Sequence, residues 1–226
     1  MMFEVVAAAA MMVLGGIGQA GEPDKPATPA EIATARTHAD DLIRRAEAIN
    51  LFDNITGDDG VPRVKHRASG MTCDFSGDDH DYIRVFPQAA SRIPRGDDVG
   101  CGKRMLNAEH TTYATRYPDR HSAEDDLRAA VAAITQRLPD ARPHEGGFPI
   151  VSRDGGAAVL GALYDVTVGD KPRLTLVLVS RVGDWNLKHR ATGDRPAGDA
   201  EGGDMMMPLV AGMSFMMSLP GERDRL

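Results

Sequence analysis

The stretch Leu174-Thr175-Leu176-Val177-Leu178-Val179 decides the fold class of this 226-residue chain. Every residue in it except the threonine is apolar. A strand with apolar residues at almost every position is buried on both faces of its sheet. We therefore expect this stretch to form a central strand.

Turn residues bound this stretch on both sides. Gly169-Asp170-Lys171-Pro172 precedes it and Gly183-Asp184 follows it, which gives predicted strands at residues 157–168, 173–182 and 185–192. Short, turn-rich gaps between apolar and β-branched runs are typical of an antiparallel meander.

The other predicted strands are shorter and lie earlier in the chain. Met71, Cys73 and Phe75 alternate with polar residues, so we expect the side chain of Cys73 to point into the core. The full set of these strands is residues 61–67, 71–75, 81–86 and 109–117. The turn-rich segments at residues 53–60, 87–102 and 143–149 are predicted to be loops, and residues 148–152 lead into the meander.

Three helices are predicted to cover the sheet. Thr28-Pro29-Ala30-Glu31 is a capping box that begins the first helix, and Ser122 with Asp125 begins the second in the same way. The apolar run Met205–Leu219 predicts a third, largely buried helix. The sequence thus predicts an α+β fold for residues 21–226, as a single domain, with an antiparallel sheet of about six or seven strands and three covering helices.

The first 20 residues have the pattern of a secretory signal. Val5 to Ile17 is an apolar run, and Gly18-Gln19-Ala20 places small residues where a signal peptidase cleaves. Glu4 stands where a positive charge is expected, which leaves two alternatives open: a buried N-terminal helix, or a short uncleaved anchor. The apolar run is shorter than the roughly 20 residues of a membrane span, so we expect a periplasmic or secreted protein with no span in the mature chain.

Composition and motifs exclude several classes of function. The formal net charge is −7 and aromatic residues make up only 5 %, which disfavours a nucleic-acid-binding surface. The sequence has no Gly-x-Ser-x-Gly elbow, phosphate-binding loop or dinucleotide fingerprint. We therefore predict no cofactor and assign no catalytic residue.

The chain has two cysteines, Cys73 and Cys101. In an exported protein a pair of cysteines is most simply a disulfide. The alternative is a reactive thiol, which needs a nearby base, and the sequence places no convincing base beside either cysteine.

Two heptapeptides nearly repeat. Residues 64–70 read Val-Lys-His-Arg-Ala-Ser-Gly and residues 187–193 read Leu-Lys-His-Arg-Ala-Thr-Gly. If both strands lie in one sheet, four cations and two histidines could form an anion-binding face. The alternative is two solvated strand faces with chance similarity. The candidate ligand-binding residues are Lys65, His66, Arg67, Lys188, His189 and Arg190.

These patterns favour a non-catalytic protein that binds an unidentified partner protein or a small ligand, with an anion as one option. The alternative is an envelope hydrolase that uses histidine and aspartate, assisted by a metal at Asp78–Asp81. That turn is rich in oxygen ligands but lacks the ligand spacing of a calcium loop, so a solvated turn is the simpler interpretation and we assign no metal ligand.

Four stretches together resemble a set of uncharacterised exported proteins of Gram-negative bacteria. They are Asp41-Leu42-Ile43, Leu51-Phe52-Asp53-Asn54-Ile55-Thr56, His66-Arg67-Ala68-Ser69-Gly70-Met71-Thr72-Cys73 and Arg95-Gly96-Asp97-Asp98-Val99-Gly100-Cys101. The resemblance covers about residues 30–190 and implies export, but it carries no activity and no catalytic residue. The order of elements is also loosely similar to the PsbP/Mog1 class of α+β domains, which implies a binding or assembly role.

We predict that the mature chain begins at Gly21, because small residues precede it at the expected cleavage site. The measurement is the intact mass of the protein recovered from its native host, before and after reduction and alkylation. The expected result is loss of residues 1–20, with alkylation of both cysteines only after reduction. A full-length chain with two free thiols would contradict the prediction of export.

Overall fold

The computed structural model describes residues 26–87, 93–119, 121–145, 158–195 and 206–221. The predicted signal segment and residues 148–152 lie outside this part of the chain. The helices are α1 (Pro29–Arg45), α2 (Ala123–Arg137) and α3 (Met206–Ser218). The strands are β1 (Phe52–Asn54), β2 (Arg63–His66), β3 (Thr72–Asp74), β4 (Tyr82–Val85), β5 (Asp98–Met105), β6 (Ala108–Thr115), β7 (Arg142–Pro143), β8 (Val159–Val168), β9 (Lys171–Val182) and β10 (Trp185–Asp194).

A seven-stranded antiparallel sheet forms the centre of the described structure, with strand order β4-β5-β6-β10-β9-β8-β7. The predicted meander is confirmed: β8 pairs with β9, and β9 pairs with β10. All residues from Leu174 to Ser180 are buried, so β9 is the strand covered on both faces. The predicted α+β class with three helices is confirmed as well.

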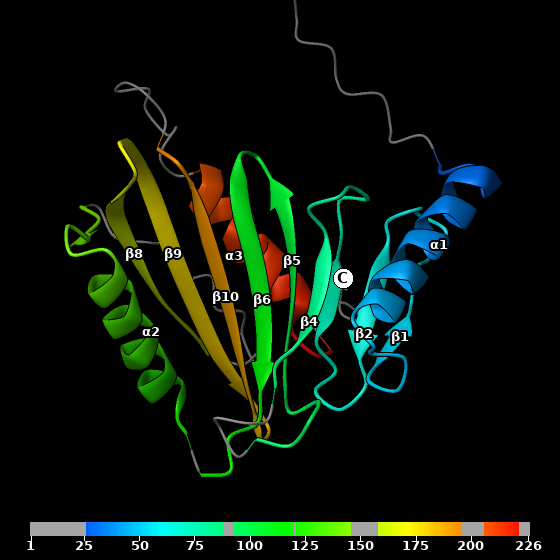
Figure 1. The fold of residues 1–226 in the computed structure, drawn as a ribbon, viewed down its shortest axis with the longest axis horizontal. Coiled ribbons are helices and arrows are strands. Elements are labelled where there is room, and N and C mark those ends of the chain that lie inside the picture. The colour runs from blue at the N-terminus through cyan, green and yellow to red at the C-terminus, as the bar shows by residue number, and fades with distance from the viewer. Residues whose placement is uncertain (1–25, 88–92, 120, 146–157, 196–205, 222–226) are drawn as a thin grey trace, which may run out of the picture.

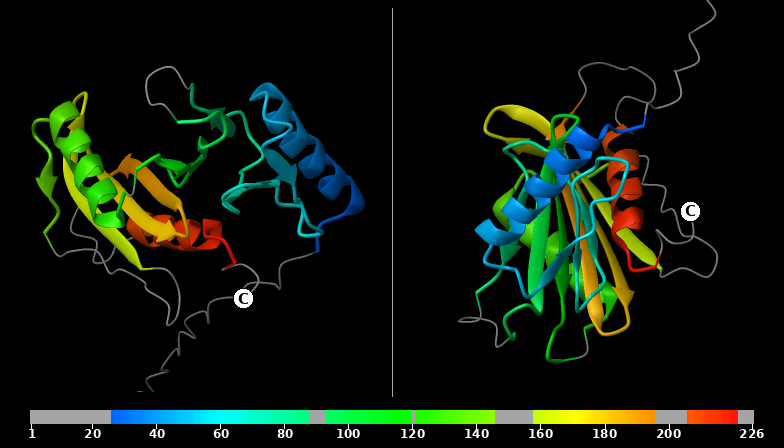
Figure 2. Two further views of the ribbon diagram at one scale, coloured as in Figure 1. Left: turned by 90° about the horizontal axis from the view of Figure 1, so that it is seen from below. Right: turned by 90° about the vertical axis from the view of Figure 1, so that its right-hand side faces the viewer.

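Alternation along β9 divides the core into two layers. Val177 and Val179 pack against Ile134 of α2 on one face of the sheet. Leu176 and Leu178 belong to a larger cluster on the opposite face, where α3 lies. Figure 1 and the left view of Figure 2 show α2 and α3 on opposite sides of the sheet. Each helix thus shields one face of this apolar strand from water.

The strands predicted at residues 61–67 and 71–75 do not join the main sheet. They form β2 and β3 of a separate sheet with the order β1-β2-β3, and α1 packs on this small sheet (Figure 1). Ala39, Leu42 and Ile43 of α1 belong to the same hydrophobic cluster as the inner face of the large sheet, which is the face that α3 covers. The predicted capping boxes at Thr28 and Ser122 are both present.

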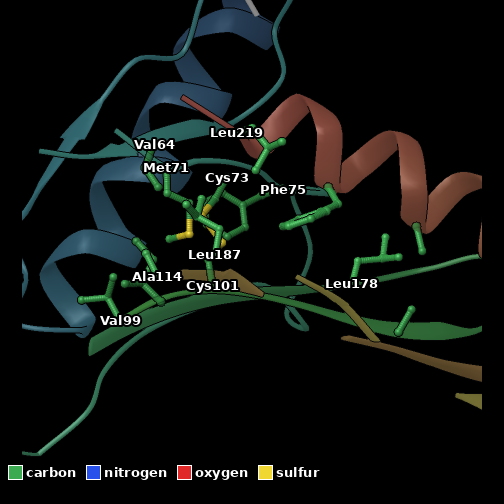
Figure 3. Close-up of a cluster of buried hydrophobic side chains, with 14 of the residues drawn as sticks. Val64, Met71, Cys73, Phe75, Val99, Cys101, Ala114, Leu178, Leu187 and Leu219 are labelled. Atoms are coloured by element: carbon green, nitrogen blue, oxygen red, sulfur yellow. A yellow bond between two sulfur atoms is a disulfide. The ribbon is translucent and has the colours of Figure 1, made fainter. Parts of the chain in front are cut away.

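The predicted disulfide is confirmed, and it joins the two sheets. Cys73 lies on β3 and Cys101 lies on β5, and both side chains are buried. Figure 3 shows the two sulfur atoms inside the apolar cluster, near Phe75 and Leu187. A covalent link between elements 28 residues apart in the chain removes conformational freedom from the unfolded state, worth on the order of 3 kcal/mol.

The prediction of an irregular loop at residues 87–102 is wrong for its last part. Residues 98–102 begin the eight-residue strand β5, which pairs with β4 and β6. Gly100 and Gly102 suggested a loop, but here they make room for aromatic rings of the neighbouring strands: a Cβ atom on Gly102 would lie 2.3 Å from the Tyr82 ring. Two short strands also overlap the first residues of predicted loops: β1 (Phe52–Asn54) overlaps the loop predicted at residues 53–60, and β7 (Arg142–Pro143) overlaps the one predicted at residues 143–149.

The third helix is only partly buried, which corrects the prediction of a largely buried element. Phe215 and Ala211 are in the core, whereas Met206, Leu209 and Met213 are 56 %, 48 % and 62 % exposed. The helix covers the sheet with one side and presents apolar side chains on the other. None of the described helices combines the length and the hydrophobicity needed to cross a bilayer.

We predict that Gly102→Ala lowers the free energy of unfolding by about 1–3 kcal/mol, because the added methyl group overlaps the Tyr82 ring. Urea denaturation measures the change. In a Tyr82→Ala background the same substitution should cost much less, since the obstacle is gone. Gly57→Ala is the matched control, because its Cβ atom would come no closer than 3.5 Å to Asp59. A full penalty in the Tyr82→Ala background would contradict this explanation.

Candidate functional site

A cavity of about 250 Å³ lies between α3, β3 and the inner face of the large sheet. Its apolar lining includes three thioether side chains, Met105, Met213 and Met217, together with Phe75. The Cys73–Cys101 disulfide forms part of the wall. The remaining side chains that matter for chemistry are polar and come from β5, β6 and β10: Lys103, His110, Thr112 and His189.

The pairing of β6 with β10 brings the two histidines together. His189 lies opposite Thr112, and His110 lies opposite Ala191, so both imidazoles project from the same face of the sheet. His110 Nδ1 is 3.3 Å from His189 Nε2, and His189 Nδ1 is 2.9 Å from Thr112 Oγ1. Each histidine is only 2 % exposed. The three side chains therefore form a buried hydrogen-bonded chain at the cavity wall.

Among these three hydrogen-bonded side chains, one ring nitrogen has no hydrogen-bond partner among the described residues. His110 Nε2 is buried and makes no hydrogen bond. A buried polar atom without a partner costs about 1–3 kcal/mol, so such atoms are uncommon. Among the described residues, His66 Nε2, Asp165 Oδ1 and Arg173 Nε are further atoms of this kind.

The three hydrogen-bonded side chains have two possible tautomeric arrangements. If Thr112 donates its hydroxyl proton to His189 Nδ1, then His189 Nε2 donates to His110 Nδ1, and His110 Nε2 carries a proton. If every hydrogen bond is reversed, His110 Nε2 has a lone pair instead.

Burial keeps both imidazoles neutral at neutral pH. Desolvation is the main cause that lowers the pKa of His110 to about 4, with a further lowering by the positive charge of Lys103. The backbone of Met105 raises the pKa of His110 and so opposes this lowering, although it forms no hydrogen bond of normal geometry with His110 Nε2. Desolvation, His110 and Lys103 together lower the pKa of His189 to about 3.

Lys103 supplies the positive charge at this site. It pairs directly with His110 in the register of β5 and β6, and its side chain also lines the cavity. The carboxylate at the other wall, Asp74, is 2.8 Å from Nε of Arg63. The cavity thus combines an apolar wall with one lysine, one aspartate and two buried histidines, an arrangement suited to binding rather than to covalent chemistry.

The candidate residues of β10 point to different sides of the sheet. His189 faces the cavity, whereas Lys188 faces α2, with its Nζ atom 3.7 Å from Asp126 and 5.5 Å from the Tyr113 ring centroid. Arg190 follows Lys188 on that side, where its charge also acts on Tyr113. Strand alternation therefore separates the histidine from the two cations of its own heptapeptide.

The candidate residues of β2 lie in the other sheet. Lys65 and Arg67 are exposed, and Arg67 pairs with Asp53 at 2.7 Å. His66 is buried between the rings of Phe52 and Trp185, at centroid distances of 5.0 and 5.4 Å, and its Nδ1 is 2.9 Å from Ser69 Oγ. The condition on which the anion-binding face depended, that both heptapeptides lie in one sheet, is not met.

The turn considered for a metal has a structural role. Both oxygens of Asp81 accept backbone N–H groups, from Ser76, Gly77 and Asp78, and Oδ2 also lies 3.0 Å from His38 Nε2. These contacts fold the turn and connect it to α1. Among the described residues no cluster of three or more histidine, cysteine, aspartate or glutamate side chains could hold a metal ion.

Sequence reasoning missed Lys103, His110 and Thr112 as parts of a site. A usable signal was present: His110 and Thr112 occupy alternate positions of a predicted strand, so they share one face. The pairing of that strand with β10, which sets them beside His189, follows only from the sheet order.

The solved structures that are similar to this chain include two distant neighbours. No family model matches the chain, and no curated protein matches it. PA94 of Pseudomonas aeruginosa, a protein of unknown function, has a TM-score of 0.37 with 10 % identity, over 66 % of this chain and 92 % of that chain. LpqN of Mycobacterium tuberculosis, which is involved in cell envelope biogenesis, has a TM-score of 0.33 with 16 % identity, over 62 % of this chain and 84 % of that chain. At these TM-scores neither neighbour supports an inference about function, and the resemblance to the PsbP/Mog1 class stays an expectation.

We predict that the buried histidines make the protein sensitive to mild acid. The pKa of His66 is also lowered by burial, to about 4, compared with the ordinary value of 6.5. The unfolded state therefore takes up protons first, and the stability present above pH 6.5 is lost as the pH falls toward about 4. Each such histidine should contribute a loss of about 1.4 kcal/mol per pH unit in this window.

Urea denaturation between pH 8 and pH 4 measures this effect. His66→Gln should reduce the slope by the share of one residue, because the substituted side chain takes up no proton. A free energy of unfolding that stays constant between pH 6.5 and 4.5 would contradict the prediction.

Proposed function

We propose that this is a non-catalytic periplasmic or secreted protein that binds a small ligand in the cavity beneath α3. The observation that carries the proposal is the cavity of about 250 Å³ beneath α3, whose apolar lining includes Phe75 and three methionines. A concave, mostly apolar space with a few polar side chains is the typical form of a small-molecule site.

The disulfide supports the proposal of an extracytoplasmic protein. Cys73 and Cys101 are bonded inside the core, and structural disulfides are typical of extracytoplasmic proteins. The same bond forms a wall of the cavity, so the site depends on an oxidised protein. This supports binding of a ligand found outside the cytoplasm.

The titration behaviour of the imidazoles disfavours catalysis. A general base is most effective when its pKa lies near the working pH. The pKa values of about 4 and about 3 leave His110 and His189 as weak bases, and no described carboxylate forms a hydrogen bond with either ring. The pair is therefore better suited to hold a ligand than to move its protons.

The alternative, a hydrolase that uses histidine and aspartate at residues 78–81, has less support. Asp81 is 3 % exposed and its oxygens already accept three backbone N–H groups. Its partner His38 belongs to α1, and the pair does not line the cavity. A catalytic dyad needs a concave space for substrate beside it.

The test is a fluorescence titration with N-phenyl-1-naphthylamine, a neutral apolar probe that brightens in apolar sites. We predict saturable binding by the wild-type protein and a loss of at least about tenfold in affinity for Ser214→Phe, because the new ring fills the cavity. Leu209→Phe is the matched control on the exposed side of the same helix and should bind as wild type.

Circular dichroism and thermal unfolding of both variants verify that they fold. Absence of saturable binding, or equal binding by Ser214→Phe and wild type, would overturn the proposal.

A further inference from the structure

We propose that the ligand is a compact, neutral, bicyclic aromatic molecule, held by the methionine side chains of α3 and β5 and by the ring of Phe75. This inference rests on the proposed function and specifies the chemical class that the cavity selects. The chemistry of the wall, the charge of the lining residues and the volume of the cavity each support it.

The wall of the cavity is rich in sulfur. Met105 from β5 and Met213 and Met217 from α3 supply thioether side chains. The Cys73–Cys101 disulfide lies in the same wall. Sulfur is polarizable and makes favourable contacts with aromatic rings, often at the ring edge. An aromatic guest therefore gains contacts here that a saturated guest with the same skeleton does not.

Two of the thioethers come from one side of α3, and an aromatic ring accompanies them. Met213 and Met217 are four residues apart in the helix, so they lie on the same side of it, one turn apart. Phe75, which directly follows β3, also lines the cavity and is held in the core. Ring pairs gain free energy in offset-stacked and edge-to-face arrangements. The wall thus offers an aromatic guest both sulfur–ring and ring–ring contacts.

The charges of the lining residues favour a neutral ligand. Among the described lining residues the charged side chains are Lys103 and Asp74, which are opposite in sign. Burial keeps His110 and His189 neutral at neutral pH. An ionic guest would lose its hydration in a mostly apolar space that has no net charge to compensate it. A neutral guest avoids this cost and leaves the contacts of Lys103 and Asp74 in place.

The volume of the cavity indicates the size of the ligand. An apolar cavity of roughly 150 Å³ is enough to bind benzene. The cavity beneath α3 has a volume of about 250 Å³. The difference provides space for about one further fused ring. Met213 lines the cavity and is also 62 % exposed, so the cavity reaches the surface beside α3 and a ligand can enter there.

The experiment compares 2-naphthol with decahydro-2-naphthol at pH 7.5, by calorimetry and by displacement of N-phenyl-1-naphthylamine. The two compounds share a ring skeleton and a hydroxyl group, both are neutral at this pH, and they differ in aromaticity. Because the saturated compound is at least as apolar, transfer out of water alone predicts no preference for 2-naphthol. We expect 2-naphthol to bind about tenfold or more tightly, through its contacts with sulfur and with Phe75.

Two double variants test the role of the thioethers. Met213→Leu/Met217→Leu removes two sulfur atoms from the wall at nearly constant volume. It should weaken binding of 2-naphthol by about threefold or more and leave binding of decahydro-2-naphthol unchanged. Met206→Leu/Met216→Leu is the matched control, because these two methionines of the same helix lie outside the cavity lining, and it should bind both compounds as wild type.

The outcomes separate this inference from the proposed function. If decahydro-2-naphthol binds as tightly as 2-naphthol while the naphthylamine probe binds in the cavity, the aromatic class is overturned and the cavity remains a binding site. A preference for 2-naphthol that is unchanged in Met213→Leu/Met217→Leu also overturns the inference, because the preference then arises away from these methionines. If the naphthylamine probe itself fails to bind, the proposed function fails as well.

A second readout locates the bound ring without relying on affinity. In protein labelled with ¹³C in the methionine methyl groups, the ring current of bound 2-naphthol should shift the methyl signals of Met105, Met213 and Met217. The signal of Met206, which is 56 % exposed and lies outside the cavity lining, should not move. Saturation with 2-naphthol that leaves the three lining methyl signals in place would contradict the inference.

Discussion

The burial of β9 on both faces is the constraint on which the rest of the structure depends. A strand that is apolar at almost every residue from Leu174 to Val179 must be covered twice, because its side chains alternate between the two faces of the sheet. The chain meets this requirement with α2 on one face and with α3 on the other. The small sheet and α1 extend the layer that contains α3, which makes this second layer thicker and less regular than the layer formed by α2. The cavity lies within this second layer.

The disulfide holds that second layer in place. Among the described residues the small sheet shares no ladder hydrogen bonds with the large one, since the two sheets have separate strand orders. Cys73 and Cys101 connect them covalently, and the Thr72 hydroxyl donates to the carbonyl oxygen of Met217 at 2.9 Å, which connects β3 to α3. The walls of the cavity therefore come from the small sheet, the large sheet and α3, and side-chain contacts rather than backbone pairing hold these three parts together. Reduction of the disulfide would loosen the site along with the fold.

The buried histidines make the site polar, and burying their polar rings costs folding free energy. His110 and His189 satisfy each other and Thr112 through one series of hydrogen bonds, and the remaining nitrogen, His110 Nε2, is buried without a partner among the described residues. Their low pKa values follow from burial, so the same desolvation that suits them to bind also makes them poor acid–base catalysts. Lys103, which is partly exposed, adds a positive charge at the edge of the cavity.

Local residue order is enough to specify the meander and the two capped helices, because strand alternation, turn residues and helix caps act over a few residues. The pairing of the two cysteines follows from their number, since the chain has only two. Local residue order also indicates the inward direction of Cys73. It does not reveal β5, since Gly100 and Gly102 have the composition of a loop, and their role as spaces for Tyr113 and Tyr82 depends on strands that pair from a distance. The separation of β2 from β10 and the meeting of His110 with His189 are likewise consequences of sheet order. Similar heptapeptides thus have different surroundings, because a side chain's environment depends on which strand lies beside it and which layer covers it.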